Sequence, residues 1–164
     1  ITGTPGTGKT AIAKKLAEKY GLYCLDINRI ISKNKLAESY DRKRRTKIVN
    51  VNKLNKKLIE EIKAFKKIKP EKHKGIIIDS HLSHYLPRKY ADFVIVAKYG
   101  IKELNKRLKR RKYSKNKIQE NLQAEIFDVC YTEATERKHR TAIVDTTSYR
   151  TTKKTLDMMK EAIN

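Results

Sequence analysis

The residues best suited to chemistry stand at the start of the chain, where positions 3–10 read GTPGTGKT. This stretch completes the G-x-x-x-x-G-K-T pattern of a phosphate-binding loop. Glycines let the backbone wrap around an anion, while successive N–H groups and the positive end of the following helix point towards it. In that pattern Lys9 reaches the β- and γ-phosphates of a nucleotide, and the Thr10 hydroxyl is offered to Mg²⁺. An accidental Lys-Thr after a glycine-rich turn is the alternative, which the helical pattern that follows at once disfavours.

An acidic residue at the end of a second strand usually completes the Mg²⁺ site of such a loop. Asp79 has this position, because it directly follows the apolar run Ile-Ile-Ile at 76–78. We therefore expect Mg²⁺ to be held by Thr10 and Asp79, the latter through water. The alternative is that Asp79 only caps the next segment as a turn residue. His81, two positions later, is on its own a loop histidine that has a catalytic role only in the less common case.

The net charge of the chain is +22, from 40 Lys and Arg against 18 Asp and Glu. Two segments carry nearly all of it, because residues 29–74 have a net charge of +12 and residues 98–117 a net charge of +9. An excess of this size attracts polyanions, so we expect a partner that bears phosphate. Solvated faces of lysine-rich helices, as in some thermophilic proteins, are the alternative.

The two charged segments lie where a phosphoryl-transfer enzyme needs mobile covers, because the charge of both nucleotides must be offset and water excluded. Residues from about 29 to 74 have the place of a helical acceptor-binding insert, and residues from about 110 to 117 have the place of a short lid. We expect Arg111 to reach the transferring phosphoryl group, since its planar fork matches phosphate oxygens better than a lysine does. Arg29 and Arg88 are the candidates for the acceptor phosphate. A solvated surface arginine is the alternative for all three.

These residues need a scaffold in which strands and helices alternate. Short apolar runs bounded by turns predict buried parallel strands at 23–26, 76–79, 93–97 and 142–145. Helical patterns lie between them, at 9–20, 28–38, 47–69, 102–110, 117–137 and 153–163. We expect one α/β domain over 1–164, a P-loop NTPase with a parallel five-stranded sheet flanked by helices and a core of 1–28, 75–109 and 118–164. Because a phosphate loop follows a strand, the sequence is expected to begin inside that strand.

Composition argues against several classes of protein. No apolar run approaches the roughly 20 residues that cross a bilayer, and no secretory signal opens the chain, so we expect a cytoplasmic protein without a membrane partner. Cys24 and Cys130 are far apart and lack zinc-ligand spacing, which argues against a disulfide framework or a zinc knuckle. The sequence does not predict the oligomeric state.

Three blocks of sequence together resemble one family. They are TGTPGTGKT (2–10), IIIDSHLSHYLP (76–87) and NLQAEIFDVCYTEA (121–134). The first has a proline inside the loop, and the second has a D-x-H form of the acidic strand followed by an aromatic residue and a proline. The third, a helix of the form N-x-Q-x-E-I-F-x-V-x-Y-x-E-A, is the most distinctive. Over nearly its whole length the chain resembles the small nuclear and archaeal-type adenylate kinases linked to ribosome assembly, also called coilin-interacting nuclear ATPases.

The resemblance implies a broad-specificity nucleoside monophosphate kinase that converts ATP and AMP to two ADP and has appreciable ATPase activity. It gives His81 a role in orienting the attacking water or in coupling hydrolysis to conformational change. It also implies transient binding to a small-subunit ribosomal platform protein and to pre-rRNA during late maturation of the small-subunit rRNA. The ATP contacts that it implies are Gly6, Gly8, Lys9, Thr10, the backbone at Ala11, and Arg111.

The chain departs from the family pattern in its basic segments. Ser32 stands where relatives carry an arginine on the first insert helix, with Arg29 one turn earlier, and Lys112 replaces a lid glycine. RKRRTK at 42–47 replaces acidic residues of the eukaryotic members. Two other functions remain open: a P-loop kinase of another small-molecule acceptor, such as a shikimate- or gluconate-type substrate, and an assembly ATPase or RNA-binding factor in which monophosphate transfer is incidental.

Overall fold

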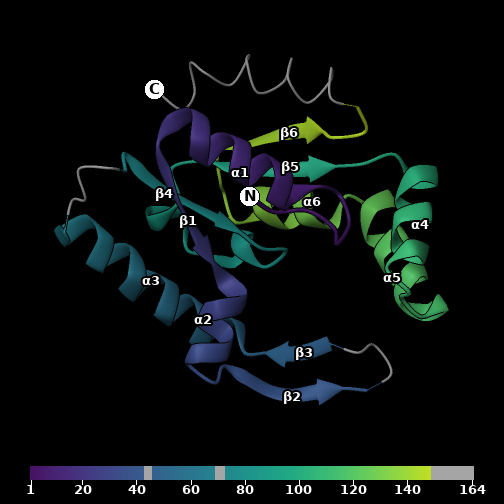
Figure 1. Ribbon diagram of the computed structural model, residues 1–164, viewed down its shortest axis with the longest axis horizontal. Coiled ribbons are helices and arrows are strands. Elements are labelled where there is room, and N and C mark those ends of the chain that lie inside the picture. Colours follow the sequence, from purple (N-terminus) through teal and green to yellow (C-terminus); the bar gives the residue numbers. More distant parts are fainter. Residues whose placement is uncertain (43–45, 69–72, 149–164) are drawn as a thin grey trace.

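The computed structural model describes residues 1–42, 46–68 and 73–148. Strands and helices alternate along this part of the chain (Figure 1). The elements are α1 (Lys9–Tyr20), β1 (Leu22–Asp26), α2 (Ile27–Lys33), β2 (Ala37–Asp41), β3 (Thr46–Val49), α3 (Val51–Ile68), β4 (Gly75–Asp79), the 3-10 turns η1 (Ser83–Tyr85) and η2 (Arg88–Tyr90), β5 (Val94–Lys98), α4 (Ile101–Arg110), α5 (Lys115–Ile126), α6 (Val129–Glu136) and β6 (Thr141–Asp145). The helix expected at 153–163 lies outside the described residues. No helix in the described ranges has the length and apolar character needed to span a bilayer.

The four predicted strands are confirmed to within a residue at each end, and they pair in parallel. β1 pairs with β4, and β5 pairs with β6. Ile1 and Thr2 connect the two pairs, because the N–H of Ser80 donates to Ile1 O at 3.2 Å and the N–H of Thr2 donates to Ile95 O at 2.8 Å. A continuous five-stranded sheet is not confirmed, since the described strands form separate two-stranded sheets. The carboxyl ends of β4 and β5 nevertheless lie beside the loop that follows Thr2.

Helices cover both faces of the parallel strands. Alternate residues of a strand point to opposite faces, and Ile95 packs with α1 residues while Val96 packs with Ala134 of α6. Likewise Ile77 of β4 belongs to the cluster with α1, and Ile78 contacts the cluster that contains α3. Helix α1 therefore lies on one face, and α3 and α6 lie on the other.

The insert after β1 differs from the two long helices expected there. Helix α2 ends at Lys33 rather than near 38, and an antiparallel hairpin of β2 and β3 precedes α3. The helix ends where Lys35 takes a positive φ of 50° and the N–H of Leu36 donates to Ile31 O at 3.0 Å. Figure 1 shows the hairpin projecting away from the parallel strands, below α2 in that view.

The single helix expected at 117–137 is divided into α5 and α6. The break falls at Asp128, which has a positive φ of 53°. The ammonium group of Lys98, at the end of β5, forms an ion pair with the Asp128 carboxylate and donates to Glu125 O at 2.7 Å. A lysine from a strand distant in the sequence thus donates a hydrogen bond to a carbonyl group at the end of α5. The local pattern of apolar residues could not predict this contact.

The core beneath the insert provides a test of this packing. Leu58 of α3 is 1% exposed and lies in the cluster with Leu25 and Ile30, whereas Ile68 on the same helix is 74% exposed. Replacing Leu58 by alanine is expected to lower the free energy of unfolding by about 2–5 kcal/mol, because the substitution leaves a cavity. Ile68→Ala is the matched control and should change it by less than about 0.5 kcal/mol. Urea denaturation measures both, and equal losses would contradict the assigned packing.

Candidate nucleotide site

The phosphate loop is held in a conformation that its glycines make possible. Gly3, Gly6 and Gly8 have φ angles of 136°, 99° and 89°, a region that residues with a side chain rarely adopt. At Gly6 a Cβ would also lie 2.9 Å from Leu104 Cδ1 on α4, so that leucine side chain would have to shift. The predicted role of these glycines in wrapping the backbone therefore has a geometric basis, and the loop is in direct contact with α4.

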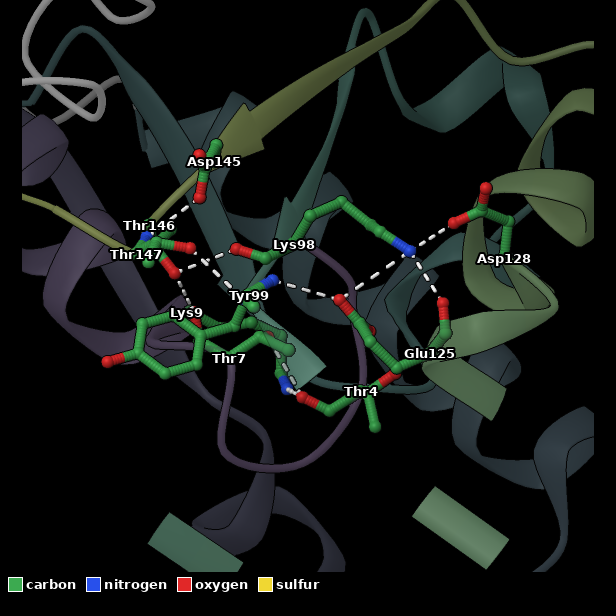
Figure 2. Close-up of polar contacts among 11 residues, drawn as sticks. Thr4, Thr7, Lys9, Lys98, Tyr99, Glu125, Asp128, Asp145, Thr146 and Thr147 are labelled. Carbon is green, nitrogen blue, oxygen red and sulfur yellow. Dashed lines mark hydrogen bonds and ion pairs between the residues drawn. The ribbon is translucent and has the colours of Figure 1, made fainter. Parts of the chain in front are cut away.

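Two side chains from outside the loop hold its carbonyl groups. The Arg107 guanidinium donates to Gly6 O at 3.1 Å and lies over the Tyr99 ring, 3.7 Å from its centre. The Thr146 hydroxyl lies within hydrogen-bond distance of the carbonyl oxygens of Thr7 and Lys98 (Figure 2). The loop is thereby tied to the ends of β5 and β6.

Lys9 folds back over the loop. Its Nζ atom donates to Gly3 O at 2.8 Å and to Thr4 O at 2.9 Å, as Figure 2 shows for Thr4. Burial lowers the pKa of Lys9 from its usual value, and the nearby Asp79 carboxylate opposes that shift. The ammonium group therefore sits where the loop backbone curves, in the place from which the P-loop pattern has it reach phosphate.

Thr10 and Asp79 meet next to Lys9. The Thr10 hydroxyl donates to Asp79 Oδ2 at 2.6 Å, which brings together two oxygen ligands from residues 69 positions apart in the sequence. Mg²⁺ prefers oxygen ligands and is usually bound through one or two protein groups, substrate phosphates and water. No cluster of three or more His, Cys, Asp or Glu side chains in the described ranges could hold a metal ion. The hydroxyl–carboxylate pair therefore fits Mg²⁺ that arrives with a nucleotide.

Two cavities of about 790 and 680 Å³ meet at this point. The larger lies between the loop and helices α5 and α6, and the smaller lies between α2, the hairpin and the end of β4. Both are lined by Lys9, Thr10, Asn28, Thr46, His81 and Leu82. The geometry therefore offers two adjoining chambers that share Lys9 as a lining residue.

The site residues predicted from the sequence differ in which cavity they line. Lys9, Thr10 and His81 line both cavities, Asp79 lines the smaller, and Arg111 lines the larger, as do Gly6, Gly8 and Ala11. Arg111 is near enough to Lys9 to contribute to lowering the pKa of that lysine. Of the described residues, neither Arg29 nor Arg88 lines either cavity. Asn28, Ile31 and Ser32 form the wall from α2 at helical spacing, and Arg29 is turned about 100° away from Asn28.

His81 keeps an exposed surface within the cavities, yet its imidazole is hard to protonate. Desolvation by the surrounding protein, and then the electrostatic effects of Lys9, His84 and Lys117, lower the pKa of His81 from 6.5 to about 4. At neutral pH the ring is uncharged, and one of its nitrogens can accept a hydrogen bond. A neutral imidazole beside Lys9 is suited to orient a polar group, such as a water molecule.

Two polar networks near the site were not predicted from the sequence. The buried His84 ring bonds to the Thr2 hydroxyl at 2.6 Å and to the Glu133 carboxylate at 2.7 Å, and Tyr85 donates to the same carboxylate at 2.9 Å. His84 and Glu133 both lie in motifs quoted for the resemblance and both line the larger cavity. The motifs were thus a usable signal, although the contacts themselves join residues far apart in the sequence.

The second network joins β5 to the α5–α6 corner. Glu125 is 3% exposed, accepts from the Tyr99 N–H at 2.9 Å, and lies 3.5 Å from Lys98 Nζ (Figure 2). A buried carboxylate is stable only when it is paired and hydrogen-bonded, and Lys98 and Tyr99 supply both. Glu125 therefore joins the end of β5 to α5, whose residues Asn121 and Ala124 line the larger cavity.

Comparison with known proteins identifies a nucleotide-binding family over most of the chain. A family model described as an AAA domain, AAA_18, matches residues 1–128. A protein of Methanocaldococcus jannaschii named "Putative adenylate kinase" is 38% identical over 163 residues, which cover 99% of this chain and 84% of that protein. Proteins of the same name from Pyrococcus furiosus and Methanosarcina acetivorans are 39% and 34% identical, over 90% and 100% of this chain and 73% and 84% of theirs. The chain therefore belongs to this family of archaeal adenylate kinase-like proteins and contains a P-loop domain of the AAA_18 type.

Proposed function

We propose that the protein is a broad-specificity nucleoside monophosphate kinase, converting ATP and AMP to two ADP in the cytoplasm, and that it also hydrolyses ATP. The observation that carries the proposal is the pair of cavities that meet at Lys9. A nucleotide kinase needs two anionic substrates to approach each other end to end, and a plain ATPase needs only one such chamber. The names of the relatives support the same reaction for those proteins.

In this mechanism the chain supplies position and charge rather than covalent chemistry. The loop N–H groups and Lys9 bind the donor phosphates, and Arg111 approaches from the connection between α4 and α5. Mg²⁺, when bound with the nucleotide beside Thr10 and Asp79, offsets phosphate charge. The two covers exclude water, so that the acceptor rather than water attacks.

We assign hydrolysis to the same donor chamber, with His81 orienting the water. Its neutral ring can accept a hydrogen bond at neutral pH, because the pKa of His81 is lowered to about 4. Phosphoryl transfer to a monophosphate does not require a histidine that orients water, since positioning and charge supply most of the barrier reduction. The two reactions should therefore differ in how strongly they depend on His81.

We further propose that the basic outer surface binds pre-rRNA and a small-subunit ribosomal platform protein during late maturation. Residues 29–74 and 98–117 hold 21 of the 22 net positive charges. Two nucleotides and Mg²⁺ present only a few net negative charges, so the excess calls for another polyanion. An assembly ATPase that releases from pre-ribosomes on hydrolysis is compatible with the kinase reaction.

A P-loop kinase of a different small-molecule acceptor is the remaining alternative. A coupled assay with a panel of nucleoside monophosphates separates the two, because inactivity on all of them would favour the alternative.

Replacing Lys9 by alanine is expected to lower ADP formation from ATP and AMP by at least about 100-fold, because a cation aimed at the transferring phosphoryl group is lost. The fold should persist, as judged by circular dichroism. Lys14→Ala is the matched control, since Lys14 is an exposed lysine on the same helix. Full activity of the Lys9 variant in the coupled assay would refute the proposed site.

Replacing His81 by alanine is expected to reduce ATP hydrolysis about 10-fold or more while reducing AMP phosphorylation by much less. The two rates are measured on one preparation, by phosphate release without AMP and by ADP formation with it. An equal loss in both reactions would eliminate the hydrolysis-specific role.

The RNA proposal predicts a steep salt dependence. The logarithm of the affinity for a small-subunit rRNA fragment should fall against the logarithm of salt concentration with a slope of about −4 or steeper, since each neutralised phosphate releases a counterion. Fluorescence anisotropy at several salt concentrations measures the slope. A slope of about −1 to −2 would assign the excess charge to solvated helix faces.

A further inference from the structure

The smaller cavity contains a cation that sequence reasoning did not single out. Of the described residues that line it, two carry a positive charge at neutral pH, Lys9 and Lys47. Lys9 belongs to the phosphate loop and is bonded to its carbonyl groups. Lys47, on β3 of the hairpin, is therefore the charge available to a second anion in this chamber.

Lys47 is placed against a hydroxyl group on the opposite wall. Its Nζ atom donates to Ser32 Oγ of α2 at 3.4 Å. Within the described ranges no carboxylate forms an ion pair with Lys47. An exposed ammonium group and a hydroxyl lie together here without any carboxylate of the described residues in an ion pair, and both can donate to an anion. The Asp79 carboxylate lines the same cavity and accepts from the Thr10 hydroxyl.

An aromatic ring lies beside this pair. Tyr40 of β2 is directly opposite Lys47 in the antiparallel register, so the two side chains project from the same face of the hairpin. Tyr40 also lines the cavity and leaves 57% of its surface exposed. Ile31 and Val49 line the cavity as well and supply apolar surface. The chamber thus has a cation and a flat aromatic ring, which complement the phosphate and the base of a nucleotide.

We propose that Lys47 and Ser32 bind the phosphate of the acceptor nucleoside monophosphate and that Tyr40 stacks on its base. This inference rests on the proposed kinase function and names the acceptor site within it. It replaces Arg29 and Arg88 as the phosphate contacts, because neither lines the chamber. Stacking on a tyrosine face uses the π-surface that every base has, so the site accepts different bases.

The phosphate half of the proposal is tested with Lys47→Ala. The KM for AMP is expected to rise about 10- to 100-fold with the KM for ATP unchanged, because a charge-assisted contact to one substrate is removed. Lys47→Arg should restore most of the affinity. Lys63→Ala is the matched control, since it removes one positive charge from an exposed position on α3 of the same insert. An unchanged KM for AMP in the Lys47→Ala variant would overturn the assignment.

A binding measurement separates failure of this site from failure of the kinase function. Isothermal titration calorimetry of AMP without ATP should show the same 10- to 100-fold loss in Lys47→Ala. If the wild type phosphorylates no monophosphate yet binds AMP through Lys47, the kinase function fails and the site stands. If AMP is phosphorylated normally and Lys47→Ala binds it as well as wild type does, the site fails and the kinase function stands.

The base half is tested with a ligand that lacks a base. Tyr40→Leu should weaken AMP binding about 5- to 100-fold, the loss expected for one base–aromatic stack, and leave the affinity for ribose 5-phosphate unchanged. Tyr40→Phe keeps the ring and should bind AMP normally. Equal losses for AMP and ribose 5-phosphate in Tyr40→Leu, or a full loss in Tyr40→Phe, would refute stacking.

Discussion

The ammonium group of Lys9 is the charge around which the rest of the site is arranged. Lys9 is partly buried. The carbonyl oxygens of Gly3 and Thr4 accept hydrogen bonds from it, the Asp79 carboxylate offsets its charge, and part of it still lines the open cavities. Desolvation lowers the pKa of His81 most, and the charge of Lys9 lowers it further. Lys9 therefore contributes positive charge to both cavities and lies close enough to interact with the Asp79 carboxylate.

The parts of the fold that could be read from the sequence are those governed by local patterns. The four strands were found to within a residue, because buried parallel strands are short continuous apolar runs. The helical pattern at 9–20 ends just before Gly21, which takes a left-handed conformation with its N–H bonded to Ala17 O. The hairpin and the break at Asp128 were missed, because the first depends on pairing across the insert and the second on a lysine from β5.

The same division applies to the candidate site. Lys9 and Thr10 follow from the spacing of the P-loop pattern, and Asp79 follows from its place at the end of the apolar run 76–78. The resemblance supplied His81, which lies on the wall of both cavities. Lys47, Ser32 and Tyr40 come together only because an unpredicted hairpin folds over α2, so no spacing in the sequence connects them. The P-loop motif describes the larger cavity, whereas of these three residues of the smaller cavity the family pattern drew attention only to position 32 and not to Lys47 or Tyr40.

The contact between Gly6 and helix α4 limits which parts of the molecule can move independently. Gly6 packs closely on the side chains of Leu104 and Leu108, and Arg107 of the same helix donates to the Gly6 carbonyl. A rotation of α4 would therefore drag the phosphate loop with it and spoil the anion site. In the proposed kinase, a closing movement of residues 110–117 would therefore bend beyond the end of α4, near Lys112, where the backbone has a positive φ of 56°. Helix α4 would then keep its position against the phosphate loop, and Arg111, at the end of α4, would lie next to the point of bending.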